Sequence, residues 1–252
     1  MVGTPVFAQE LFAKKGMFSP FEATTEKLQK ITTKNMIGGY PILLLNDEMR
    51  LMLSRVTYST GVVAPLGRAV ITSTKNKKFL TALDTTANLE SSNSSDWTDT
   101  PCKREDFLWK RSTGLSIKDV NCVSINHRVN FFVSPTGDFQ QIYRTLKDEE
   151  VEIPPTTLTV AFTRYRPNGQ RLVYIVEVNP EIYGIERDAT TIWGSSGWYK
   201  DFVTRDSKKV EFIERLKKWA TDVQDRMDSA FKKDARAFLD LKSLDEYLIG
   251  AE

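Results

Sequence analysis

The stretch that decides the fold runs from Leu158 to Val178 and reads LTVAFTRYRPNGQRLVYIVEV. Its first half alternates apolar and polar or small side chains, the pattern of a β-strand with one buried face. Pro167, Asn168 and Gly169 then supply turn residues, because proline presets φ and the other two tolerate left-handed backbone. The stretch therefore predicts a β-hairpin, with Arg164 to Arg166 near its tip expected to guard an exposed edge.

Upstream of this hairpin, segments rich in β-branched and aromatic residues alternate with turn residues, which predicts an antiparallel meander. The expected strands are Arg50–Thr60, Gly67–Thr74, Lys78–Thr86, Asp106–Arg111 and Asn121–Val133. Two further segments, Glu22 to Ile31 and Phe139 to Glu150, are expected to form helices.

Downstream, apolar residues recur at helical spacing from about Lys208. They are Phe212, Ile213, Leu216, Trp219, Ala220, Val223, Met227, Ala230 and Phe231. This stripe predicts one long amphipathic helix, capped by Asp206 or Ser207, that packs on the sheet. The fold class is therefore α+β: an antiparallel sheet, meander plus hairpin, packed by a long C-terminal amphipathic helix.

The 252 residues suffice for one large domain, and we assign residues 9–252 to it. Residues 90–96 are rich in serine and lack periodicity, which predicts a mobile surface loop. Residues 1–8 are interpreted as the remnant of an export signal, because Val6-Phe7-Ala8 before Gln9 has the form of a cleavage site. The alternative is a chance tripeptide in a cytosolic protein.

Cys102 and Cys122 are the two cysteines, and an even count in an exported chain predicts one disulfide. The alternative is two unrelated buried thiols. Lysine and arginine number 35 against 33 acidic residues, and the charges are interspersed, which argues against a nucleic-acid partner. No apolar run is long enough for a membrane span, and two cysteines with one histidine are too few for a metal site. No cofactor motif is present.

The loop Trp193-Gly-Ser-Ser-Gly-Trp198-Tyr199-Lys200-Asp201 is the best candidate for ligand binding. Trp193, Trp198 and Tyr199 offer aromatic faces for sugars or cations, and Lys200 or Asp201 can add directional polar contacts. The alternative is that the tryptophans anchor the loop to the core.

His127 is the only histidine, so any histidine-dependent mechanism must use it. Strand alternation places its side chain on the face opposite Cys122 and Ser124, so a nucleophile–base pair requires a bulge. A structural histidine is the simpler interpretation. The carboxylates Glu177 and Glu181 flank a strand end, but their separation cannot be assigned.

The sequence thus favours a non-enzymatic role. We expect an exported soluble protein, periplasmic or secreted, that acts as a binding or interaction module. Its partner would be a small molecule, a glycan or an envelope protein of unknown identity. An envelope hydrolase using His127 with Ser124 or Cys122 is the first alternative, and a cytosolic regulatory protein is the second.

Overall fold

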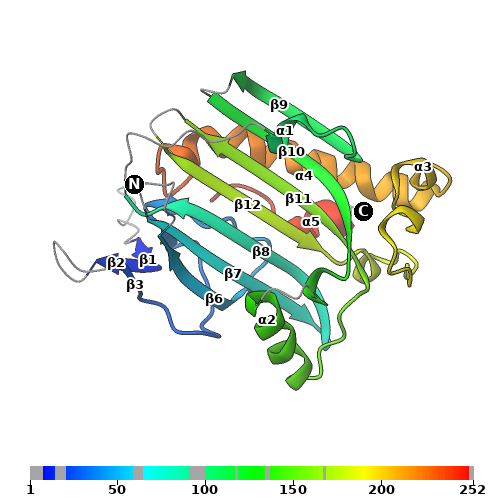
Figure 1. Ribbon diagram of the computed structural model, residues 1–252, viewed down its shortest axis with the longest axis horizontal. Coiled ribbons are helices and arrows are strands. Elements are labelled where there is room, and N and C mark those ends of the chain that lie inside the picture. The colour runs from blue at the N-terminus through cyan, green and yellow to red at the C-terminus, as the bar shows by residue number, and fades with distance from the viewer. Residues whose placement is uncertain are drawn as a thin grey trace.

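The computed structural model describes residues 8–14, 21–58, 65–90, 100–116, 119–133, 137–166 and 169–249. Its centre is a seven-stranded antiparallel sheet in the order β6-β7-β8-β12-β11-β10-β9 (Figure 1). The strands are β6 (Arg50–Thr57), β7 (Leu66–Lys75), β8 (Lys78–Asn88), β9 (Trp109–Ser116), β10 (Asp119–Val129), β11 (Thr156–Tyr165) and β12 (Arg171–Val178). The α+β class, the meander and the hairpin are confirmed.

The predicted hairpin β11–β12 lies in the middle of this sheet. β12 pairs with β8, with Ile175 opposite Asp84, and β11 pairs with β10, with Ala161 opposite Ser124. The prediction of an exposed edge at Arg164 is therefore wrong. Its guanidinium is only 3% exposed and forms ion pairs with Asp119 and Asp228, the second at 2.8 Å.

One face of the sheet is covered by α4 (Ser207–Phe231), the long helix that the sequence predicts (Figure 1). All nine residues of its apolar stripe are buried, and Trp219 meets the Phe162 ring edge-on at 5.6 Å. Asp206 caps the helix by accepting hydrogen bonds from the backbone N–H groups of Lys208 and Lys209. The short helices α3 (Lys200–Val203) and α5 (Leu244–Ile249) flank α4 in the chain.

The N-terminal segment lies at the β6 end of the sheet (Figure 1). It contains β1 (Gln9–Glu10), β2 (Phe12–Lys14), β3 (Phe21–Ala23), β4 (Asn35–Ile37) and β5 (Tyr40–Pro41). The helix expected from Glu22 to Ile31 is absent, because Leu28 and Ile31 donate backbone hydrogen bonds to Leu51 and Met49 instead. Tertiary hydrogen bonding has overridden local helix propensity here.

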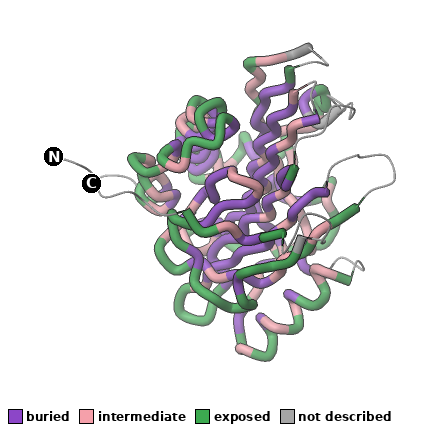
Figure 2. The backbone as a smooth tube through the Cα atoms, turned by 90° about the vertical axis from the view of Figure 1, so that its left-hand side faces the viewer, coloured by how far each residue is buried: buried purple, intermediate pink, exposed green. Residues whose placement is uncertain are grey.

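Helices of the described ranges cover the opposite face only at its two sides. α2 (Gly137–Asp148), the second predicted helix, packs Ile142 and Leu146 against the β6–β8 side. α1 (Thr100–Lys103) lies on β10, and no helix of the described residues lies on the sheet between these two (Figure 1). In Figure 2 the buried residues are concentrated in the strands, with exposed segments around them. The predicted Ser-rich loop lies almost entirely outside the described residues.

No helix in the described ranges combines the length and apolarity needed to cross a bilayer.

Candidate functional site

A cavity of about 400 Å³ lies on the sheet face opposite α4; we call it the sheet-face pocket. Strand alternation explains its position, because Val123 and Ile125 of β10 point into the α4-side core while Cys122, Ser124 and Asn126 point the other way. The floor of the sheet-face pocket is formed by side chains of β10, β11 and β12. They are Ser124, Asn126, Thr159, Ala161, Thr163 and Ile175.

One wall of the pocket follows α1 and consists of Arg104 and Phe107. A disulfide joins Cys102 of α1 to Cys122 of β10, with the two Cα atoms 5.8 Å apart, so the predicted bridge is confirmed. The bridge ties this wall to the floor. The Arg104 guanidinium stacks on Phe107 at 5.2 Å and forms an ion pair with Asp106.

Trp193, which begins the short 3-10 helix Trp193–Ser195, forms a second wall of the pocket. Its indole stacks on the His127 ring, with centroids 5.0 Å apart and planes 8° from parallel. His127 Nε2 lies 3.0 Å from the Trp193 carbonyl oxygen, and Trp193 Nε1 donates to the His127 carbonyl at 3.3 Å. Two reciprocal hydrogen bonds thus hold this Trp193–His127 stack, and Tyr199 supports it edge-on.

The Trp193–His127 stack also determines the state of the imidazole. Because a carbonyl only accepts, Nε2 must carry the proton of the neutral ring. Burial lowers the pKa of His127, which keeps the ring neutral at pH 7. Among the described residues Nδ1 has no hydrogen-bond partner. His127 therefore acts as a neutral support for the aromatic wall.

The other residues of the predicted Trp loop do not line the pocket. Trp198 is 0% exposed and packs against Phe212, with Lys209 over its ring, so it has no surface left for a ligand. This matches the anchoring alternative. Lys200 and Asp201 are exposed on α3. Asp188, which precedes the loop, accepts hydrogen bonds from Ser196 Oγ and the Gly197 backbone N–H, at 2.6 and 2.8 Å.

The residues of the hydrolase alternative meet in this pocket without forming a catalytic arrangement. Both Ser124 and His127 line it, but no hydrogen bond joins them in the part of the chain that is described. Cys122 is held in the disulfide and offers no thiolate.

The sequence analysis names Glu177 only as one of two carboxylates near a strand end, and it does not predict the buried cluster that Glu177 forms beside the pocket residue Thr159. Glu177 of β12 is 1% exposed and accepts hydrogen bonds from the hydroxyls of Thr157 and Thr159, at 2.7 and 2.9 Å. Arg128 Nη1 lies 3.2 Å from its Oε1. Burial raises the pKa of Glu177, and the Arg128 charge opposes this shift. The strand register pairs Thr159 with Glu177, so the hairpin predicted from the sequence already places these two residues opposite each other.

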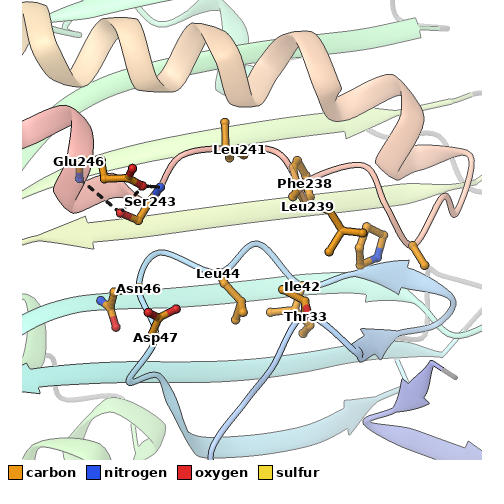
Figure 3. Close-up of a pocket in the computed structure, with 12 residues that line it drawn as sticks. Thr33, Ile42, Leu44, Asn46, Asp47, Phe238, Leu239, Leu241, Ser243 and Glu246 are labelled. Carbon is orange, nitrogen blue, oxygen red and sulfur yellow. Dashed lines mark hydrogen bonds between the residues drawn. The ribbon is translucent and has the colours of Figure 1, made fainter. Parts of the chain in front are cut away.

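A second cavity, of about 410 Å³, lies between segment 41–47 and segment 235–246; we call it the two-segment groove (Figure 3). Figure 3 shows Leu44 and Asp47 on one side and Leu241 and Ser243 on the other. The Glu246 carboxylate accepts hydrogen bonds from Ser243, whose hydroxyl receives the Glu246 N–H, so both residues cap α5. Among the described residues, the lining of the groove includes the aromatic Phe238 but no arginine or lysine, unlike that of the sheet-face pocket.

No group of three or more histidine, cysteine, aspartate or glutamate side chains suitable for a metal ion occurs in the described ranges. Comparisons with protein-family models, with curated proteins and with solved structures found no match for this chain.

Proposed function

We propose that this chain is an exported binding protein that holds a small amphipathic ligand in the sheet-face pocket. The observation that carries this proposal is the cavity of about 400 Å³ between an aromatic wall and a polar sheet floor. Cavities of this size, mostly apolar with a few convergent polar groups, are typical of small-molecule sites.

Preorganised walls support binding rather than a purely structural role for the cavity. The disulfide holds the Arg104 wall, and the reciprocal hydrogen bonds hold the Trp193 wall. A site that is already ordered before the ligand arrives avoids the entropic cost of ordering side chains on binding. The ligand would lie against Trp193 and Ile175 and would direct polar groups to Ser124 or Thr159.

The disulfide also supports the location that we propose, because such bridges persist in the periplasm and outside cells. The cytosolic alternative predicts free thiols at Cys102 and Cys122 in protein taken directly from cells. The hydrolase alternative has no supporting contact, since Cys122 is bridged and His127 Nε2 is bonded to a carbonyl.

The test uses two variants that each fill one cavity. Ala161→Trp places an indole in the sheet-face pocket, and the control Ala235→Trp places one in the two-segment groove of similar volume. The probe is N-phenyl-1-naphthylamine, a neutral aromatic molecule that fluoresces when it enters an apolar site. We expect Ala161→Trp to abolish probe binding and Ala235→Trp to leave it unchanged.

Thermal unfolding of both variants checks that they fold. Probe binding that survives in folded Ala161→Trp, or that is lost only in Ala235→Trp, would refute the assignment to the sheet-face pocket.

A further inference from the structure

The charged side chains that line the sheet-face pocket within the described ranges are of one sign. Arg104 and Arg128 line it, none of the described aspartates or glutamates does, and His127 is neutral. A ligand that carries an anionic group would complement this lining, whereas a cationic ligand would meet two guanidinium groups.

The two arginines differ in how many donors they have left. Arg104 already holds the Asp106 carboxylate through two nitrogens, Nε and Nη2. Arg128 makes a single ion pair, through Nη1, with Glu177. Its Nε and Nη2 have no hydrogen-bond partner among the described residues.

Arg128 is also held in position although its side chain is 42% exposed. Glu177 anchors one nitrogen from a buried site, and the guanidinium stacks on the Phe131 ring at 5.0 Å. The unused donors therefore belong to a positioned group rather than to a freely rotating surface side chain.

Glu177 would repel an incoming anion, so its effect must be weighed. Other arginines of this protein show that one guanidinium accommodates two carboxylates. Arg68 contacts Asp84 at 2.7 Å and Asp138 at 3.0 Å, and the buried Arg164 contacts both Asp119 and Asp228. Arg128 binds one carboxylate, that of Glu177, and within the described residues it binds no second one.

We infer that the ligand supplies this second anionic group, a carboxylate, sulfonate or phosphate, which binds Arg128, while its apolar or planar part lies against Trp193. The inference rests on the proposed function and narrows it to amphipathic anions. Arg128 is a binding residue in this arrangement, and Glu177 is its positioning residue.

The experiment compares two probes that differ in one group. 1-Anilinonaphthalene-8-sulfonate has the ring system of N-phenyl-1-naphthylamine plus a sulfonate. Arg128→Gln is expected to raise the Kd of the sulfonate at least tenfold, which is about 1.4 kcal/mol. The Kd of the neutral probe should change less than twofold.

Controls separate this effect from misfolding and from general surface charge. Arg128→Gln leaves Glu177 buried without its ion-pair partner, so the double variant Arg128→Gln/Glu177→Gln, which removes both charges, should show the same selective loss. Arg187→Gln removes a cation that pairs with Glu152 and does not line the pocket, and should not discriminate between the probes.

The outcomes distinguish the two proposals. Equal losses for both probes in the double variant, or unchanged sulfonate binding, would overturn the anion inference. The proposed function would stand in either case, provided that the parent binds the neutral probe and Ala161→Trp does not. Neutral-probe binding that persists in Ala161→Trp would overturn the proposed function itself, and the inference with it.

Discussion

Removal of the Cys102–Cys122 disulfide should destabilise the protein by about 3 kcal/mol. In the loop-entropy model, the stabilisation depends on the length of chain that the bridge closes, and a sequence separation of 20 gives about 3 kcal/mol at 25 °C. Both cysteines are buried with Val120, Tyr165 and Val173, so a Cys102→Ala/Cys122→Ala variant keeps most of the surrounding apolar contacts. The loss is a large share of the 5–15 kcal/mol typical of a folded domain.

The measurement is urea unfolding of the oxidised protein, the reduced protein and the double variant. We expect the two unbridged forms to agree with each other and to show a larger m-value than the oxidised form. The reason is that an unfolded chain without the cross-link exposes more surface. Both unbridged forms should also bind 1-anilinonaphthalene-8-sulfonate more weakly, because Arg104 and Phe107 are no longer tied to β10.

A loss below about 1 kcal/mol with an unchanged m-value would refute the entropic argument. It would mean that the unfolded chain is already compact between the two cysteines, or that the bridge destabilises the native state by nearly as much as the entropic effect stabilises it. Weaker probe binding without any loss of stability would separate the role of the bridge at the site from its role in folding.

Three further predictions concern stability. Because burial raises the pKa of Glu177, the folded protein binds the proton of this carboxyl more tightly than the unfolded chain does. The free energy of unfolding therefore falls as the pH rises above the ordinary pKa of a glutamate. Glu177→Gln should therefore be more stable than the parent at pH 7, by about 1 kcal/mol. Urea titrations should show this difference shrink towards pH 4.5, and a difference that stays constant with pH would contradict the argument. Trp198→Ala should cost about 3–5 kcal/mol in thermal or urea unfolding, whereas Trp193→Ala should cost less and weaken probe binding, since only Trp198 is fully buried. Asp206→Ala should cost about 1 kcal/mol by removing the cap of α4, and an unchanged midpoint would show that the cap is dispensable.

The strands of the hairpin and the helix α4 were predictable because they depend on local periodicity. A period of two marked the strands of the hairpin, and a period of 3.6 marked the stripe of α4. The order of strands was not predictable, because the pairing of β12 with β8 joins residues about 90 positions apart in the chain, such as Tyr174 and Thr85. That pairing places the hairpin in the centre of the sheet, and contacts with Asp119 of β10 and Asp228 of α4 bury Arg164 instead of exposing it.

The Trp loop was found from its composition, but composition did not separate its two tryptophans. Trp193 and Trp198 lie five positions apart in a segment without regular period, so no alternation rule assigns them to a face. The contacts of the loop decide the matter: Asp188 bonds Ser196 and Gly197, Trp198 packs against Phe212, and Trp193 stacks on His127. The contacts with Phe212 and His127 join segments whose proximity depends on the complete fold.

Glu177 shows how an ordinary pattern can conceal a functional candidate. In Val173-Tyr174-Ile175-Val176-Glu177-Val178, the glutamate occupies the face opposite the main core, where a charged residue in a half-buried strand is unremarkable. What makes it unusual is the neighbouring strand, which presents Thr157 and Thr159 on the same face and reduces its exposure to 1%. A carboxylate buried in this way requires a positive partner, and Arg128 supplies it from the strand beyond. The same ion pair that compensates the burial of Glu177 thus brings a guanidinium with unused donors to the sheet-face pocket, and this links the stability of the sheet to the chemistry of the ligand that we propose.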